Sequence, residues 1–192
     1  MAIHSTPASM LKESLDELLE AATYCSEYRK TDEKWGDFKT GGCLGYPGAI
    51  LLFAIVDSIG SYFRKNKNLI ITIDSRKVTI DKDGWEHFKI LNSKYFKQNL
   101  SEAFIRALYL EFRSYLTHNS VLGKYAGMVM NTASLERPYK GCAFFQMNVN
   151  DSAIHYWTSI KELLDLCKYA VQEFKKDIDD VIPTSRQGKE FH

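Results

Sequence analysis

The chain of 192 residues is long enough for one domain with a sizeable core, and 45% of its residues are hydrophobic. Its 25 basic and 24 acidic side chains leave a formal net charge of +1, which excludes recruitment of nucleic acid by a strong overall positive field. Any contact with nucleic acid must come from a local patch or from an oligomer. We expect a single domain over 1–192, with an ordered core over about 5–180 and a polar C-terminal tail over 183–192.

Cysteine spacing and hydropathy bear on metal binding and on the cellular compartment. The 4 cysteines are far apart, with no Cys-x-x-Cys pair and no histidine at zinc-site spacing, so we expect no metal site. The N-terminus does not resemble a secretory signal, and the most apolar run, 49–56, is shorter than the ~20 residues that cross a bilayer. These features predict a cytoplasmic protein with reduced thiols and no membrane contact.

The first half of the chain indicates two long helices. Thr6 and Pro7 form a favourable helix start, and apolar residues then recur at helical spacing to about Tyr28. A second helix is expected to start near Pro47. Its residues 50–63 are apolar nearly all round, which places it at the centre of a bundle.

The middle of the chain alternates between strand and helix signals. β-Branched residues at 69–73 and 78–80, separated by a polar segment, predict a small β-hairpin. A short helix over 85–96 follows. Asn99, with Glu102 three residues later, is then expected to cap a longer amphipathic helix.

Strand-like residues at 128–130 and 143–147 predict a second hairpin with a long polar connection. Ser159 and Glu162 form a capping-box pattern before a last amphipathic helix, and Pro183 is expected to end the fold. The predicted class is mainly α, an up-and-down helical bundle of four to five helices with one or two inserted β-hairpins.

Arg113 and His118, on the long amphipathic helix, place a permanent cation near a titratable imidazole, which suits binding or cleavage of a phosphodiester. Five positions apart on an ideal helix, they would point about 140° apart and could not both face one ligand. Asn119, Ser120 and Gly123 follow, so we expect His118 at a helix end, where its ring can turn back. Alternatively, a two-fold dimer supplies the other half of the site.

Asp57 lies within the otherwise apolar second helix. An unpaired carboxylate is costly to bury, so the residue is expected to meet a cation or backbone donors. Arg113 is the preferred partner, with Asp57 orienting it; a surface position facing solvent is the alternative.

The order of these elements, with Arg113-x-x-x-x-His118 on a late helix and an apolar helix ending 54–60, resembles the HEPN domain family over most of residues 5–180. The resemblance implies a metal-independent endoribonuclease without cofactors. In it His118 is a general base or acid, Arg113 stabilises charge on phosphate, and Asp57 and Asn119 support them. It also implies attack by the ribose 2′-hydroxyl, a cyclic phosphate product, RNA as substrate and a homodimer. A toxin or phage-defence setting, with an antitoxin partner, is implied as well.

Other interpretations stay open. Ser114 stands where many active members carry a larger polar or charged residue, which leaves room for an inactive HEPN-like binding or assembly module. An unrelated helical protein that binds a small ligand is the third reading. Arg113 could serve only a surface ion pair, and His118 only the helix dipole. Weaker candidates for a site are His87 with Glu86, His155, and Cys43 in its glycine-rich loop. The basic run of Arg64, Lys65 and Lys67 is interpreted as a solvated helix end.

Overall fold

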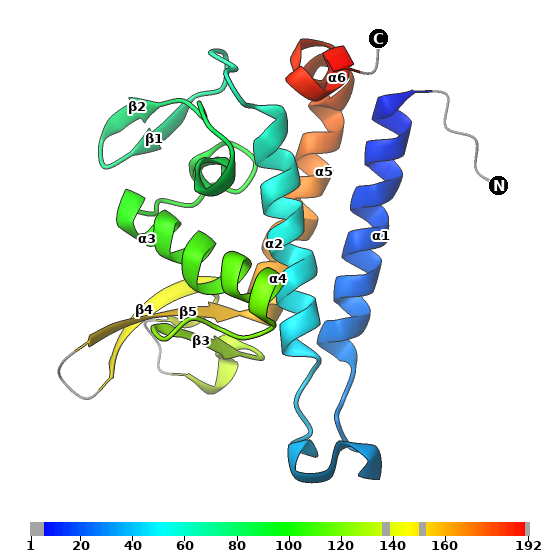
Figure 1. Cartoon of the computed structure of the whole chain (residues 1–192), viewed down its shortest axis with the longest axis vertical. Coiled ribbons are helices and arrows are strands. Elements are labelled where there is room, and N and C mark those ends of the chain that lie inside the picture. Colours follow the sequence, from blue (N-terminus) through cyan, green and yellow to red (C-terminus); the bar gives the residue numbers. More distant parts are fainter. Residues whose placement is uncertain (1–5, 136–138, 150–152, 191–192) are drawn as a thin grey trace.

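The computed structural model describes residues 6–135, 139–149 and 153–190. These residues are mostly helical, with two small β-sheets on one side of the molecule (Figure 1). The long helices α1 (Pro7–Glu27), α2 (Gly45–Tyr62) and α5 (Ile160–Thr184) lie side by side and contact one another pairwise. Figure 1 shows α2 antiparallel to α1 and α5 running in the same direction as α2. A mainly helical fold with small β-elements is therefore confirmed.

Both predicted N-terminal helices are present. Thr6 caps α1: its side chain accepts from the Ser9 backbone N–H at 3.2 Å, and the Ser9 hydroxyl in turn accepts from the Thr6 N–H. The connection to α2 contains the short helix η1 (Glu33–Phe38), at the lower tip of the molecule in Figure 1. Helix α2 is buried on several sides, as its apolar sequence predicts, and it contacts α1, α5 and the segment η2 (Gly84–Asn92).

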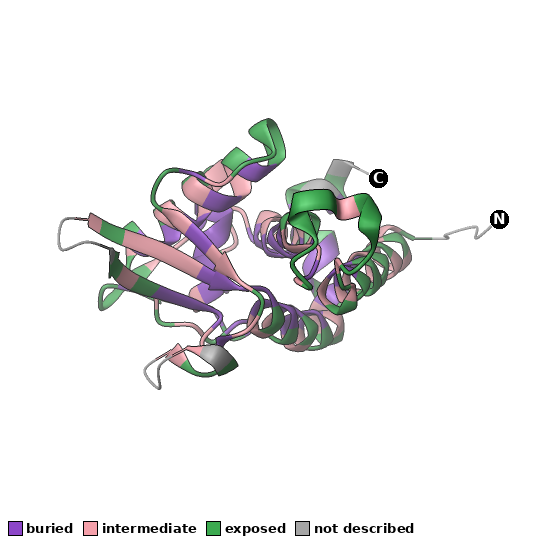
Figure 2. Cartoon of the chain, turned by 90° about the horizontal axis from the view of Figure 1, so that it is seen from below, coloured by how far each residue is buried: buried purple, intermediate pink, exposed green. Residues whose placement is uncertain are grey.

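The core forms one cluster that joins the helices to both sheets. Figure 2 shows buried positions on the inner sides of the helices and exposed positions along their outer sides. Aromatic rings from distant segments meet at Phe53 of α2, which contacts Phe88, Phe112 and Phe144. Burial of these rings together with the aliphatic side chains of the core is the main favourable contribution to folding.

The first hairpin is present, with a tighter turn than predicted. Strands β1 (Ile71–Ile73) and β2 (Arg76–Val78) pair antiparallel, so the second strand begins at Arg76, before the β-branched residues. Asp74 and Ser75 form the turn with φ values of 49° and 64°. Two positive φ angles in a two-residue loop match the twist of the flanking strands, and this match explains why the turn contains two residues and not four.

The two predicted segments near 128–130 and 143–147 both contain strands, but the predicted pairing between them is wrong. Strand β3 (Ala126–Val129) pairs parallel with β5 (Ala153–Ser159), and β4 (Phe144–Val149) pairs antiparallel with the other edge of β5. The strand Ala153–Ser159 was not predicted, because it leads directly into α5 and its last residue looked like part of a helix cap. It supplies the central strand of the sheet.

The long amphipathic helix consists of α3 (Glu102–Ala107), the π-helical segment η3 (Leu108–Ser114) and α4 (Tyr115–Asn119). Its cap is Ser101, whose side chain accepts from the Phe104 N–H at 3.2 Å, and not Asn99 as predicted. In Figure 1 this helix lies across α2 instead of alongside it, which differs from an up-and-down arrangement.

Helix α5 starts where predicted, but without the capping box. The Ser159 N–H donates to the Ala143 carbonyl at 3.0 Å, while the Glu162 carboxylate accepts from the Ser159 hydroxyl and, at 2.9 Å, from the Thr132 N–H of η4 (Thr132–Ser134). The fold also extends beyond Pro183, which lies in the last turn of α5. A short helix, α6 (Arg186–Glu190), follows.

Replacing Gly60 with alanine should destabilise the fold. Gly60 lies on α2 where η2 approaches, and a Cβ atom there would be 2.1 Å from the His87 carbonyl oxygen. Because that neighbour is backbone, α2 and η2 must separate, and we expect a loss of about 1–3 kcal/mol in the free energy of unfolding. Gly45→Ala, on the same helix, is the control, since its Cβ would meet only the Met128 side chain at 3.7 Å. Equal urea midpoints for the two variants would contradict this account.

Candidate site around Asp57

Arg113 and Asp57 form the ion pair that the sequence predicted. Arg113 comes from η3 and Asp57 from α2, and the Nη2 to Oδ2 distance is 2.8 Å. Their side chains are 26% and 19% exposed, so the pair is only partly screened by water. The guanidinium carbon also lies 5.8 Å from the ring centroid of Tyr109. These contacts fix the orientation of the Arg113 side chain.

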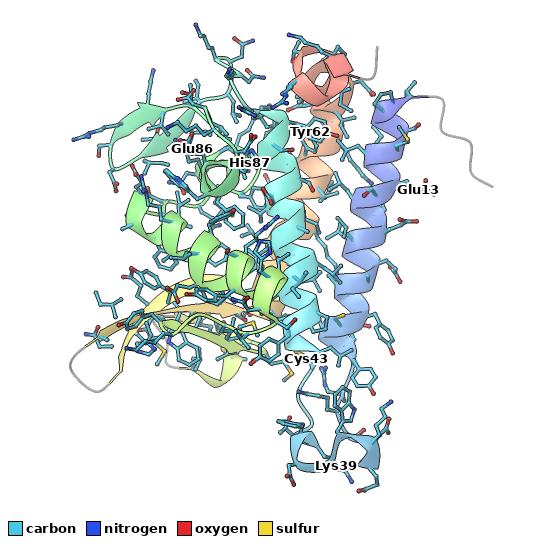
Figure 3. The ribbon with its side chains drawn as sticks, in the orientation of Figure 1. Glu13, Lys39, Cys43, Tyr62, Glu86 and His87 are labelled. Atoms are coloured by element: carbon cyan, nitrogen blue, oxygen red, sulfur yellow. The ribbon has the colours of Figure 1, made fainter. Side chains whose placement is uncertain are left out.

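Asp57 has a second partner, His87 of η2. Nδ1 of His87 lies 2.7 Å from Oδ1 of Asp57, so one carboxylate joins two elements. An ionised carboxylate only accepts hydrogen bonds, which assigns the hydrogen to Nδ1 of the imidazole. Figure 3 shows His87 and Glu86 beside α2. His87 is buried, with 8% of its surface exposed.

The second ring nitrogen of His87 lies near another carboxylate. Its Nε2 atom is buried, makes no hydrogen bond in the described part of the chain, and lies 3.5 Å from Oδ1 of Asp83. Asp83 in turn accepts from Nη1 of Arg64 at 2.7 Å. The result is an ordered row of Arg113, Asp57, His87, Asp83 and Arg64, in which each acid lies between an arginine and the imidazole.

Glu86 holds the loop that carries Asp83. Its Oε2 atom accepts from the backbone N–H groups of Asp81 and Lys82 at 2.8 and 3.1 Å and pairs with Lys89 at 3.1 Å. Burial raises the pKa of the Glu86 carboxyl, but these hydrogen bonds and the Lys89 charge outweigh it, so the net shift is downward. The carboxylate therefore stays ionised and keeps the loop closed against η2.

The helix that carries Arg113 is locally widened. η3 is π-helical over Leu108–Ser114, and the chain after α4 folds back onto it: the Gly123 N–H donates to the Glu111 carbonyl at 2.8 Å. A Cβ atom at Gly123 would lie 2.9 Å from the Glu111 Cα atom as well as 1.8 Å from the movable Glu111 carboxylate, so the close backbone approach favours glycine there. Short π-helical segments are rare and occur often at functional sites.

His118 is not joined to Arg113. It lies on the last turn of α4 and is exposed, and Asn119 beside it is exposed as well. The helix ends there as predicted, because Ser120 has a left-handed backbone with φ of 56°. No hydrogen bond or ion pair within the described residues links either side chain to Asp57 or Arg113. The expectation that the His118 ring turns back toward the arginine is not met by these contacts.

His87 is the residue that sequence reasoning undervalued. The sequence places it only among the weaker candidates, whereas the structure buries it against Asp57. The available signal was a polar residue inside a run of core residues, since Phe88, Ile90 and Leu91 are all fully buried. Two polar residues within apolar elements, Asp57 and His87, are natural partners.

The remaining sequence candidates stay outside this cluster. Cys43 is buried, and burial raises the pKa of its thiol, which disfavours a nucleophilic thiolate. His155 lies on β5 with its ring against Tyr125. Within the described residues, no three His, Cys, Asp or Glu side chains are grouped as a metal site requires. None of the helices in these ranges is both long and apolar enough to cross a membrane.

Comparison of the chain with protein-family models, curated proteins and solved structures found no match. The Asp57 cluster and the helix that carries Arg113 and His118 are therefore the features from which we infer a function.

Asp57→Asn should lower the stability of the fold, although the two side chains are nearly equal in size. The amide keeps one acceptor oxygen and cannot accept from both Arg113 and His87, so we expect a loss of about 1–3 kcal/mol in the free energy of unfolding. Asp179→Asn is the matched control, because the Asp179 side chain is 72% exposed in its pair with Lys12 and should cost at most about 1 kcal/mol. Urea unfolding of the three proteins measures the difference, and equal losses would refute a bridging role for Asp57.

Proposed function

We propose that this protein is a HEPN-type, metal-independent endoribonuclease that acts as a two-fold dimer. The proposal rests on how Arg113 and His118 lie on the helix formed by α3, η3 and α4, which we call the motif helix. Arg113 is held by Asp57 at a partly exposed position, and the same helix ends one turn beyond with His118 open to solvent. A fixed cation and an accessible imidazole are the two groups that cleavage of RNA through its own 2′-hydroxyl requires.

In the proposed reaction, His118 accepts the proton of the ribose 2′-hydroxyl as that oxygen attacks the adjacent phosphorus. The bond from phosphorus to the 5′-oxygen breaks, and a protonated imidazole returns a proton to the leaving oxygen. Arg113 offsets the negative charge that gathers on the phosphate during attack. The products are a 2′,3′-cyclic phosphate and a free 5′-hydroxyl.

A second protomer is part of the proposal because Arg113 and His118 point in different directions around the helix axis. The π-helical segment ends at Ser114, so the interval from Arg113 to His118 is largely α-helical and the offset of about 140° remains. Paired motif helices would let the arginine of one protomer and the histidine of the other face one phosphate.

Exposed apolar side chains support this pairing. Leu110 and Tyr115 on the motif helix, and Val121 just after it, are 52%, 37% and 49% exposed. Large apolar residues gathered beside polar site residues are typical of surfaces that a partner covers. The described cysteines are all free thiols, which suits the proposed cytoplasmic setting of a toxin or phage-defence protein with a cognate antitoxin.

An inactive HEPN-like binding or assembly module is the second candidate. It is favoured by one contact: the Arg113 charge is already offset by Asp57. In that reading, the cluster serves folding, and the exposed face of the motif helix binds another protein.

RNA cleavage in excess chelator tests the proposal. Purified protein is expected to release products with cyclic-phosphate ends, and His118→Ala should abolish them while leaving thermal unfolding nearly unchanged, because His118 is exposed. Loss of a general acid–base group typically lowers the rate by about 10²–10⁴-fold. His155→Ala, which changes a histidine of β5 whose ring contacts Tyr125 and which is not part of the motif, should retain activity. Cleavage that survives in His118→Ala would remove the catalytic assignment.

Leu110→Asp tests the dimer. A charge on the exposed apolar face should shift the protein toward monomer in sedimentation and lower cleavage in parallel, since the site is composite. Ile70→Asp is the matched control: Ile70 is 68% exposed, but lies beside the small hairpin and away from the motif helix. A monomeric Leu110→Asp protein with full activity would show that one protomer is sufficient.

A further inference from the structure

A basic groove lies between the end of α2 and α6. It has a volume of about 430 Å³ and is lined by Arg64, Lys65, Thr184, Arg186 and Lys189. Four of these five residues are cations, and the part of the chain that the structure describes contributes no carboxylate to the lining. The Thr184 hydroxyl donates to the Val181 carbonyl at 2.9 Å, so the cations define the chemistry of the groove.

Close packing of α6 on α5 holds one wall of the basic groove. The Ser185 hydroxyl donates to the Ile182 carbonyl at 2.7 Å and accepts from the Gly188 N–H at 3.0 Å. A Cβ atom at Gly188 would lie 1.9 Å from the same carbonyl oxygen, so the approach requires glycine. Arg186 and Lys189 therefore project from a fixed turn.

The opposite wall is fixed as well. Nη1 of Arg64 binds both carboxylate oxygens of Asp83 at 2.7 Å, so the Arg64 charge is largely offset. Lys65 and Lys189 add positive charge from the two sides of the groove. These residues are more than a hundred positions apart in sequence, and the local patch that a nearly neutral protein needs for nucleic acid exists only in the folded chain.

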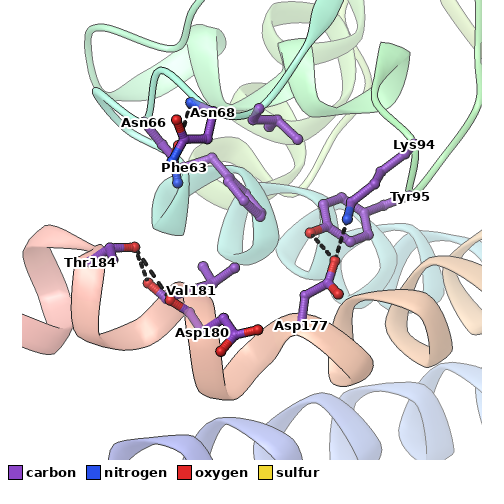
Figure 4. Close-up of a pocket in the computed structure, with 10 residues that line it drawn as sticks. Phe63, Asn66, Asn68, Lys94, Tyr95, Asp177, Asp180, Val181 and Thr184 are labelled. Atoms are coloured by element: carbon purple, nitrogen blue, oxygen red, sulfur yellow. Dashed lines mark hydrogen bonds and ion pairs between the residues drawn. The ribbon is translucent and has the colours of Figure 1, made fainter.

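A second pocket adjoins the basic groove and shares Thr184 with it. The pocket measures about 300 Å³, and Figure 4 shows its lining. Side-chain amides and a carboxylate lie there beside apolar groups, a combination that suits the edge and face of a nucleobase. The residues are Asn66, Asn68, Asp180, Phe63 and Val181. Asp177, on the same rim, is occupied by Lys94 and by the Tyr95 hydroxyl, the latter at 2.9 Å.

We propose that the basic groove binds backbone phosphates of the single-stranded RNA substrate, with a neighbouring base in the adjoining pocket. This inference rests on the proposed ribonuclease function and adds a second RNA contact to it. Lysine and arginine neutralise phosphates along a strand, and bases occupy adjacent platforms. The row from Arg64 through Asp83, His87 and Asp57 to Arg113 links one wall of the groove to the motif helix.

The test measures RNA binding without turnover. In a His118→Ala background, a labelled single-stranded RNA is titrated against the parent protein and against Lys65→Glu/Lys189→Glu, which reverses one exposed lysine on each side of the groove. Loss of two phosphate contacts should weaken binding about tenfold or more and reduce the slope of log K against log salt by about 1.4. Lys34→Glu/Lys39→Glu is the control, because both lysines are exposed, lie on or beside η1 at the opposite end of the molecule from α6 (Figure 1) and change the net charge equally.

Unchanged affinity and salt slope in the groove variant, or an equal loss in the control, would overturn the inference. Lys189→Gln provides a milder variant should the double reversal unfold, and it should lower the slope by about 0.7. A third outcome would also overturn the inference: pyrophosphate raises the thermal midpoint of the protein, while the charge reversals leave RNA affinity intact. The groove would then be assigned to small polyphosphates. Wild-type protein that binds RNA through the groove without cleaving it would refute the nuclease alone.

Discussion

The bridge that Asp57 makes between Arg113 and His87 is the interaction on which the rest of this side of the molecule depends. A carboxylate at a half-buried position on an apolar helix is costly, and two charge-assisted or polar hydrogen bonds offset that cost. Gly60 lies three residues further along α2, on the same face as Asp57. Its missing side chain lets the His87 backbone approach, which brings the imidazole within reach of the carboxylate. Packing and electrostatics are therefore coupled at one turn of α2.

The same bridge limits what the cluster can do alone. Arg113 and Arg64 are matched by Asp57 and Asp83, so the row carries little net charge when His87 is neutral. In the proposed ribonuclease, the row would orient the Arg113 guanidinium but would have little power to attract RNA from solution. Attraction would then fall to another surface, and the basic groove at the end of α2 is lined by several cations. Such a division is compatible with a net charge of +1.

Local signals explain which features were predictable. Thr6 and the apolar run of α2 identified two helices, and Asp57 stood out because a charge within an apolar helix needs a partner. The environment of His87 depends on the close approach at Gly60, which no sequence period reveals. The sequence places strands near β3 and β4 but pairs them with each other, whereas both pair with β5, Ala153–Ser159. The parallel pairing of β3 with β5 joins segments that are distant in sequence, and such pairing leaves little local signature.

The geometry of the motif helix carries the case for a composite site. Arg113 is turned inward to Asp57, whereas His118 is exposed beyond the π-helical segment, and the helix ends immediately afterward. Bringing both to one phosphate within a protomer would require the helix end to unwind or the Asp57 bridge to break, and the bridge also anchors η2. Pairing two motif helices through the exposed Leu110 and Tyr115 demands neither change. The dimer is thus the arrangement in which the proposed chemistry and the stability of the cluster are compatible.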